Sequence, residues 1–390
     1  MISFKEAFQV IESSKIPLVS EEIPLIKALN RVLAEDILSD IDMPPYDKSA
    51  MDGFACRKVD LDNELLIVEE IPAGRVPGKS IAPGQCARIM TGAMVPPGAD
   101  YVMMKEHATI LTFDSVRCNR VSENTNICYQ GEDVKSGDRL LAAGTRLLPA
   151  QLAIMAAAGC IRPKVFALPN VAVISTGNEL VEPDRRPGSG KIRNSNGIQI
   201  TAQSIHFGLQ ADYLGIIPDN MEKLAEVLAS ALKKYQLILI SGGVSVGDYD
   251  LVPAVLQQLD VEIMIHGMNV KPGKHLLFGK RENHFVLGLP GNPVSSFVIF
   301  EMLVKPLLNS LMGNTEESRW LSVPLAQTYS RKKDDTLFFI PVSLNNGTAL
   351  PLEYHGSAHI NAYSCANGIM EVPVGVRSIN EGDLVHVRPI

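Results

Sequence analysis

The stretch that decides the fold is Leu237-Ile-Leu-Ile240-Ser241-Gly-Gly-Val-Ser-Val-Gly-Asp248-Tyr-Asp250. Its first four residues are the most apolar run of their region and predict a strand, and a helical pattern follows from Tyr249. In a strand–loop–helix unit, the loop amides and hydroxyls lie where α/β proteins bind anions. Asp248 or Asp250 could instead cap the helix. The three glycines, two serines and two acids in the ten residues from Ser241 favour a ligand-binding loop.

Apolar strands alternate with amphipathic helices over residues 169–312. This pattern predicts a mostly parallel, three-layer α/β domain with ligands at the carboxyl ends of its strands. The strands are expected at Val171–Ser175, Ala211–Ile217, Leu237–Ile240 and Val261–Ile265. The helices are expected near Gly197–Phe207, at Asn220–Tyr235 and at Tyr249–Gln258.

The remaining sequence predicts three further units, so the fold class is multidomain, α/β plus all-β. Residues 1–38 and 135–168 predict a helical domain, with helices at Ser3–Ser14, Leu25–Asp36 and Pro149–Ala158. Residues 39–134 have short β-branched runs cut by Pro and Gly, which predict an inserted small β domain. Residues 313–390 return to short strands and predict a C-terminal, β-barrel-like domain.

Composition excludes several classes of protein. The 36 Lys and Arg against 43 Asp and Glu give a net charge of −7, which disfavours a nucleic-acid partner. Six scattered Cys without a Cys-x-x-Cys pair argue against a zinc ribbon and a disulfide framework. The most apolar segments are short or interrupted by Glu301 and Lys305, so we expect no membrane span. The N-terminus lacks a secretion signal, and we expect the protein in the cytosol.

Polar residues gather where the predicted strands end. Glu179 follows the first strand and has no helix to cap. Asp219 can form a capping box with Glu222 for the next helix, so the sequence supports a capping role and a functional role for Asp219 equally. Asn292, followed by Pro293, is explained completely as the N-cap of the last helix. The turn Lys271-Pro-Gly-Lys274 carries two ammonium groups that suit a small oxyanion, although a solvated turn is the ordinary role of such a pair.

Three further motifs lie outside these strand ends. Ala73–Ser80 fits a relaxed phosphate-loop pattern, but Pro83 and Gly84 follow at once where a helix would be needed. The intervening Gly and Ser in His355-Gly-Ser357-Ala-His359 argue against a zinc-protease helix. In the β domain, Asp52 and Thr91 belong to polar clusters for which we expect no pocket of their own. They would act only if another domain or subunit brings them to the ligand sheet.

As a colinear set, these blocks resemble the molybdopterin molybdenumtransferase family, the MoeA proteins with the E domain of gephyrin. The matching blocks are Pro44–Ala55, Arg88–Ala93, Gly98–Asp100, Gly131–Asp133, Ser175–Leu180, Asn194–Asn196, Ser241–Asp250, Lys271–Lys274 and Leu289–Ser295. The resemblance implies an elongated homodimer of four subdomains whose sites are shared between chains. It also implies molybdopterin adenylyltransferase and recipient molybdoenzymes as possible partners; from the composition we expect no nucleic acid and no membrane.

By the same resemblance, the enzyme inserts molybdate into adenylylated molybdopterin and releases AMP, with Mg²⁺ assisting. Asp52 and Thr91 of the partner chain, with Glu179 and Asp250, would be the catalytic residues. Glu179 and Asp250 would hold Mg²⁺; molybdate would meet Lys271, Lys274, Ser295 and Ser357. The pterin substrate would bind at Thr176, Gly177, Asn194, Ser195, Asp219, Ser241, Gly242, Gly243, Ser245, Gly247, Pro290, Gly291 and Asn292.

One departure from the family pattern leaves alternatives open. The family carries an Arg-Glu-Phe-x-Arg block in its C-terminal subdomain, whereas Thr336-Leu-Phe-Phe-Ile-Pro341 has no arginine. The run Arg331-Lys332-Lys333 lies nearby and could contribute cations. The alternatives are a catalytically weakened paralogue that binds or carries molybdopterin, and a scaffold in the manner of gephyrin, for which no receptor-binding extension is visible.

Overall fold

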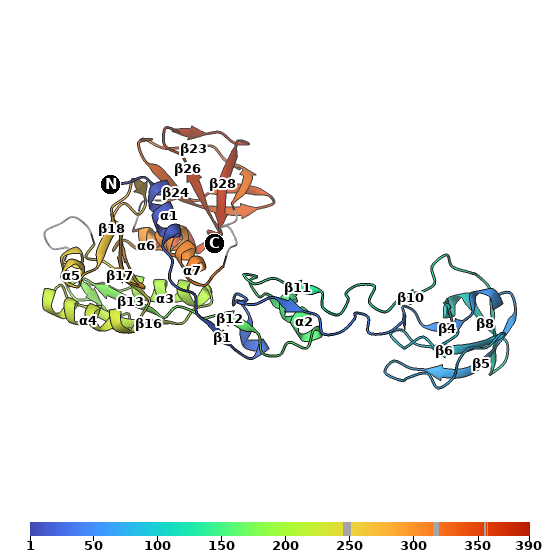
Figure 1. The fold of residues 1–390 in the computed structure, drawn as a ribbon. Coiled ribbons are helices and arrows are strands. Elements are labelled where there is room, and N and C mark those ends of the chain that lie inside the picture. The colour runs from blue at the N-terminus through green and yellow to red at the C-terminus, as the bar shows by residue number, and fades with distance from the viewer. Residues whose placement is uncertain (245–250, 315–319, 355, 357) are drawn as a thin grey trace.

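The computed structural model describes residues 1–244, 251–314, 320–354, 356 and 358–390. The chain is elongated, with the α/β unit and the C-terminal β unit at one end and the β unit that contains β4 to β8 at the other (Figure 1). A slender middle unit, which contains α2, joins these two ends (Figure 1). The multidomain α/β plus β fold that the sequence predicts is confirmed.

The α/β unit is built on one six-stranded sheet with the order β16-β13-β17-β21-β20-β18. The first four strands run parallel, β20 is antiparallel to β21, and β18 is antiparallel to β20. Their bounds are β16 Ala211–Ile217, β13 Val171–Thr176, β17 Leu237–Ser241, β21 His284–Leu289, β20 Leu277–Arg281 and β18 Glu262–His266. Every residue of β13 and β17 is buried, because helices cover both faces of the sheet.

Two apolar layers pack on this sheet because side chains alternate along each strand. Val171 and Val173 face a core shared with α1 (Phe4–Ser13), α3 (Asn196–His206), α6 (Pro293–Ile299) and α7 (Lys305–Leu311). Ala172 and Ile174 face the opposite core, shared with α4 (Met221–Lys234) and α5 (Val252–Gln258). Helix α1 therefore belongs to the α/β core and not to a separate helical domain.

The last helical run is longer than the sequence suggests. Helix α6, the π-helical turn η4 (Phe300–Val304) and α7 form one continuous run, Pro293–Leu311, of 19 residues. Its length and hydropathy would allow it to cross a membrane, but 72% of its apolar window is buried inside the structure. Burial of this kind is what the core helix of a globular unit shows.

The β unit contains a six-stranded sheet of order β7-β4-β6-β5-β9-β8. The strands are β7 Tyr101–Met104, β4 Gly53–Cys56, β6 Gln85–Ile89, β5 Glu64–Ile71, β9 Ser115–Cys118 and β8 Ala108–Ile110. Each face of the sheet has its own apolar cluster, one around Phe54 and Met103 and one around Ile71 and Ile89. The short strands β3 (Lys48–Ser49) and β10 (Ile127–Cys128) pair where the chain enters and leaves the β unit.

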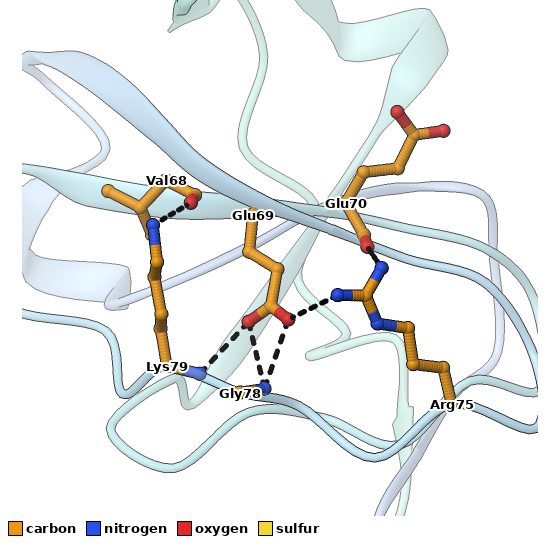
Figure 2. A network of polar contacts seen from close by, with 6 residues as sticks. All are labelled: Val68, Glu69, Glu70, Arg75, Gly78 and Lys79. Atoms are coloured by element: carbon orange, nitrogen blue, oxygen red, sulfur yellow. Dashed lines mark hydrogen bonds and ion pairs between the residues drawn. The ribbon is translucent and has the colours of Figure 1, made fainter.

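The loop that mimics a phosphate loop is occupied by the protein's own carboxylate (Figure 2). Glu69 accepts hydrogen bonds from the backbone N–H groups of Gly78, at 3.0 and 3.1 Å, and of Lys79, at 3.0 Å. Arg75 pairs with the same carboxylate at 3.6 Å. The amides that would hold a phosphate are thus already paired, in keeping with the rejected motif.

The middle unit corrects the prediction of a helical domain. It consists of the pair β1 (Ser20–Glu22) with β12 (Lys164–Phe166), the pair β2 (Ile37–Leu38) with β11 (Arg139–Leu141), and one α-helix, α2 (Pro149–Ala157). The predicted helix Leu25–Asp36 is wrong: only the 3-10 turn η1 (Leu25–Ala28) forms. Asn30 has a φ of 64°, and Val32 and Leu33 then bridge to Arg146 and Val165, so pairing with distant segments replaces the local helix.

The C-terminal unit curls into a barrel-like sheet. Its order is β19-β24-β26-β28-β22, with β25 on β24, and a bridge between Leu325 and Ala349 joins the two ends. The strands are β22 Leu321–Pro324, β24 Leu337–Asn345, β25 Thr348–Pro351, β26 Gly368–Val372 and β28 Leu384–Pro389; β23 (Tyr329–Ser330) pairs separately with β27 (Ser378–Ile379), and η5 spans Ile360–Ser364. Strand β19 (Val270–Lys271) comes from the α/β unit and pairs with β24.

Candidate functional site

Three loops converge at the carboxyl edge of the α/β sheet, after β13, β17 and β21. Gly242 has a φ of 93°, and a Cβ on it would lie 2.3 Å from the backbone oxygen of Thr176. A Cβ on Gly291 would lie 3.8 Å from the Cα of Gly242. These close approaches bring together most of the predicted pterin residues: Thr176, Gly177, Ser241, Gly242, Gly243, Pro290, Gly291 and Asn292.

A buried amide ties these loops to one another. The Nδ2 of Asn196, in the first turn of α3, donates to the hydroxyl of Ser241 at 2.7 Å and to the carbonyl of Gly291 at 2.8 Å. Its Oδ1 is buried and accepts no hydrogen bond from the residues that the structure describes. The sequence pattern assigns no role to Asn196, although its position at the start of a predicted helix near the loops is a signal that could have indicated one.

Asn194 is a scaffold of the site and not an open ligand-binding group. Its Oδ1 accepts from the Ser175 hydroxyl at 3.2 Å and from the Gly197 N–H at 3.1 Å, and its Nδ2 donates to the Tyr213 hydroxyl at 2.7 Å. Tyr213 donates in turn to Glu182 at 3.0 Å. Burial, with the neighbouring Glu182 carboxylate, raises the pKa of Tyr213 to about 12, so this phenol stays a donor. Ser195, next to Asn194, is exposed at the N-cap of α3.

Asp219 does not cap a helix. Asn220 caps α4 instead, accepting from the Lys223 N–H at 2.9 Å. The Asp219 carboxylate accepts from the Thr176 hydroxyl at 2.9 Å and from the Asn178 N–H at 3.0 Å. The capping interpretation is therefore wrong, and Asp219 fixes the loop that carries Glu179.

Asn292 also departs from its predicted role. It occupies the N-cap position of α6, with Pro293 after it, but its side chain makes no capping hydrogen bond. The side chain is exposed beside Gly291, where the loops meet. The position of Asn292 is that of an N-cap, but the predicted capping hydrogen bond does not form, and the amide is available to a ligand.

Glu179 presents an exposed carboxylate at this edge. Gly177 has a φ of 153°, and a Cβ on it would lie 2.6 Å from the Glu179 carboxylate, so a larger residue there would be strained and would displace this carboxylate. The pairing of β14 (Leu180–Val181) with β15 (Ile192–Arg193) holds the following residues. Within the described ranges, Glu179 has no hydrogen bond or ion pair through its side chain, and no three metal-ligating side chains form a cluster. Ser245, Gly247 and Asp250 lie outside the described residues.

The lysine turn is firmly attached to the core. Gly273 has a φ of 115°, and a Cβ on it would lie 2.4 Å from the Cδ1 of Ile299 in α6. Lys271 places its ammonium 5.1 Å from the ring centroid of Phe338, its register partner on β24. Lys274 is exposed. Ser295 is buried in α6, and Ser357 lies outside the described residues.

Arg331 does not replace the absent arginines. Its guanidinium donates to the carbonyls of Val376 at 2.7 Å, Thr336 at 2.8 Å and Pro373 at 2.5 Å. It also lies 4.8 Å from the ring centroid of Phe338. These contacts give Arg331 a structural role that holds the start of β24.

Asp52 and Thr91 meet in the β unit. One oxygen of Asp52 accepts from the Thr91 N–H at 2.9 Å and from its hydroxyl at 2.7 Å, and the other accepts from Lys105 at 3.1 Å. The hydrogen bonds from Thr91, with that from Lys105, hold the pKa of Asp52 well below its usual range. The sequence does not indicate Lys105, because the approach of Lys105 to Asp52 depends on the register of β7 beside β4.

Comparison with known proteins covers the whole chain. Residues 2–159 match the family described as "MoeA N-terminal region (domain I and II)", residues 172–310 "Probable molybdopterin binding domain", and residues 323–390 "MoeA C-terminal region (domain IV)". A Staphylococcus epidermidis protein named molybdopterin molybdenumtransferase is 34% identical over 399 residues, 99% of this chain and 95% of that protein. A Staphylococcus aureus protein of the same name is 32% identical over 397 residues, 99% of this chain and 95% of that protein.

A solved structure is also similar over its full length. The molybdopterin biosynthesis MoeA protein from Pyrococcus horikoshii matches with a TM-score of 0.85 at 29% identity, covering 100% of both chains. The three matches follow one another along the chain, and the match to the probable molybdopterin binding domain contains the three converging loops. The chain therefore belongs to the MoeA family, the molybdopterin molybdenumtransferases.

Proposed function

We propose that this protein is a cytosolic transferase of molybdenum cofactor biosynthesis that inserts molybdate into adenylylated molybdopterin and releases AMP. Its membership of the MoeA family supports the transferase role. The observation that carries the proposal is the convergence of three glycine-containing loops over the buried amide of Asn196. We propose further that the protein works as a homodimer with shared sites, receives its substrate from molybdopterin adenylyltransferase and supplies molybdoenzymes.

The polar groups at the sheet edge suit a pterin. A fused, polar ring system needs a few fixed donors and acceptors at a largely preformed site. The Oδ1 of Asn196, which has no partner among the described residues, and the exposed amide of Asn292 supply them, while Asn194 and Asp219 hold the surrounding backbone. The Asn196 amide is held in place before the substrate arrives, because its Nδ2 donates to Ser241 and to Gly291.

The Glu179 carboxylate at this edge fits the cation that the family implies. Glu179 is exposed, and its side chain is unpaired among the residues for which positions are given. Mg²⁺ usually takes one or two protein carboxylates together with substrate phosphate oxygens. Glu179 and Asp250 would hold Mg²⁺, which would neutralise charge on the phosphate oxygens of the adenylyl group.

Replacing Glu179 by Gln tests this role. The variant is expected to bind adenylylated molybdopterin nearly normally but to release AMP at least about tenfold more slowly, because an amide neutralises no cation. Substrate affinity by calorimetry and AMP release by chromatography are the measurements. Glu222→Gln, in the exposed first turn of α4, is the matched control and should behave as wild type. Loss of substrate binding in Glu179→Gln would show that Glu179 is a wall of the pterin pocket.

The lysine turn is the proposed molybdate site, and Phe338 positions one of its cations. The ring lies 5.1 Å from the Lys271 ammonium and is held from β24 by direct strand pairing. A cation–π contact at an exposed site contributes about 0.5–1 kcal/mol. Phe338 therefore limits where the Lys271 ammonium can lie.

Phe338→Leu is expected to raise the molybdate concentration for half-maximal activity about two- to fivefold with little change in the maximal rate. Phe338→Trp should retain wild-type dependence, because indole is the better cation–π partner. Phe113→Leu, at a side chain that is 94% exposed on the β unit, is the control. Equal molybdate dependence in the Leu and Trp variants would remove Phe338 from the proposed site.

A molybdopterin carrier is the second candidate, and one observation favours it. Thr336–Pro341 contributes no arginine, and Arg331 is committed to three backbone carbonyls. A carrier would bind molybdopterin with normal affinity but show no molybdate-dependent release of AMP.

A further inference from the structure

The middle unit meets the α/β unit at the C-terminal ends of two helices. Arg146, in the middle unit, places the central carbon of its guanidinium 5.7 Å from the ring centroid of Phe207, the C-cap residue of α3. Beyond the end of α7, a Cβ on Gly313 would lie 2.6 Å from the ring of Phe166, on β12. These two contacts form a joint at the base of an arm, residues 20–166, that comprises the middle unit and the β unit (Figure 1).

On the side of the arm, strand pairing fixes the backbone of Arg146. Arg146 bridges to Val32, and the N–H of Leu147 donates to the carbonyl of Arg31 at 2.8 Å. Val32 is 1% exposed and belongs to the same apolar core as Phe207. The Arg146 side chain therefore extends from a firmly paired part of the arm onto the α/β unit.

On the side of the α/β unit, the end of α3 holds the guanidinium of Arg146. The Nε of Arg146 is buried and has no hydrogen-bond partner among the residues that the structure describes. The last carbonyl groups of a helix carry partial negative charge, and the face of an aromatic ring attracts a cation. Phe207 is 8% exposed, so its ring cannot leave this contact without opening the core. The contact thus limits how the arm can tilt against the α/β unit.

The arm acts far from this joint. Strand β4, which begins directly after Asp52, lies at the far end of the elongated chain, whereas α3 begins with Asn196 at the converging loops (Figure 1). With shared sites, the arm of one chain serves the sheet edge of the other. A small tilt at the joint becomes a larger displacement at the far end of the arm, and a misplacement of 1 Å can cost about a hundredfold in rate.

We propose that Arg146 is a positioning residue for the site of the partner chain, because its contact with the end of α3 aims the arm that carries Asp52 across the dimer. The inference rests on the proposed function, which supplies the shared sites. Arg146 acts only through the orientation of the β unit. A residue with this role affects catalysis in the site of the other chain and leaves the site on its own sheet edge intact.

The kinetics of homodimers give the first measurement. Arg146→Ala is expected to lower kcat at least about tenfold, because the arm is no longer held at its base, while the calorimetric affinity for molybdopterin is unchanged. Arg146→Lys keeps a cation beside the ring and should restore most of the rate. Arg139→Ala is the matched control and should behave as wild type, because the Arg139 side chain is 62% exposed and pairs with Asp36 on the surface of the same unit.

Mixed dimers separate this role from a general loss of stability. Mixed with a Glu179→Gln chain, the Arg146→Ala chain should give about a quarter of the wild-type rate, because one site of each mixed dimer combines its intact Glu179 with an arm whose joint is intact. Mixed with an Asp52→Asn chain, it should give no more than its own homodimers, because every site that retains Asp52 then depends on the altered arm.

Equal recovery with both chains would show that Arg146 has a structural role only, and recovery with the Asp52→Asn chain alone would place its effect in the site of its own chain. A wild-type kcat in Arg146→Ala, or no recovery with either chain, also overturns the inference. If Arg146→Ala does not fold, Phe207→Leu removes the ring and allows the same comparison. If the Asp52→Asn and Glu179→Gln chains recover no activity together, the shared sites of the proposed function fail; if they do recover it, a failed Arg146→Ala test concerns Arg146 alone.

Discussion

Mixed dimers of an Asp52→Asn chain and a Glu179→Gln chain are expected to recover about a quarter of the wild-type rate, although each variant alone is nearly inactive. Random exchange of subunits makes about half of the dimers mixed, and each mixed dimer has one site in which both groups are intact. We expect shared sites, because β4, which begins directly after Asp52, and β13, which ends three residues before Glu179, lie at opposite ends of the elongated chain (Figure 1).

The control for this experiment uses two lesions in the same part of the site. Asp52→Asn and Thr91→Ala both lie in the β unit, where Asp52 accepts two hydrogen bonds from Thr91. A mixed dimer of these chains has one lesion in each site and should recover no activity. If the Asp52→Asn and Glu179→Gln pair also stays inactive after subunit exchange has been demonstrated by mass spectrometry, the sites are not shared.

Lys274→Ala is expected to raise the molybdate concentration for half-maximal activity about ten- to a hundredfold, while the affinity for molybdopterin is unchanged. The lysine turn is the proposed cation source, because Arg331 is engaged by backbone carbonyls. A lysine offers a point charge and not the planar fork of an arginine, so the wild-type protein itself should need a high molybdate concentration.

Lys274 is exposed, so its truncation should leave the thermal unfolding midpoint unchanged and separate binding from stability. Lys233→Ala, at an exposed position in the last turn of α4, is the matched control. Unchanged molybdate saturation in Lys274→Ala would mean that the turn is a solvated loop and that the oxyanion site lies elsewhere.

The α/β sheet could be predicted because its signals are local. Fully buried strands such as β17 appear in the sequence as uninterrupted apolar runs, and amphipathic helices such as α4 show their period directly. The middle unit could not be predicted in this way. Residues 25–36 have apolar spacing that suits a helix, but Val32 and Leu33 pair with residues more than a hundred positions away. No local pattern reports such a contact.

In the candidate site, too, the local features could be predicted and the contacts between distant residues could not. The sequence located its loops, since glycines mark the ends of β13, β17 and β21. The sequence did not predict the capping side chains correctly. Asn220 caps α4 in place of Asp219, one residue earlier, and Asn292 occupies the N-cap position of α6 without making a side-chain hydrogen bond to the helix. The β unit also contains a cavity of about 340 Å³ where the sequence predicted no pocket, because Lys105 and Arg88 come to line it only where β7 and β6 flank β4.

The insertion of the β unit between β2 and β11 has a consequence for the order of folding. Strand β2 pairs Leu38 with Arg139, so this contact closes a loop that contains the whole β unit. Closing a long flexible loop has a large entropic cost, whereas a loop whose interior has already condensed is effectively short. The pairing of Ser49 with Ile127 brings the two connections together at the base of the β unit. We therefore expect the β unit to fold first and to bring together the distant halves of the middle unit, which would condense afterwards.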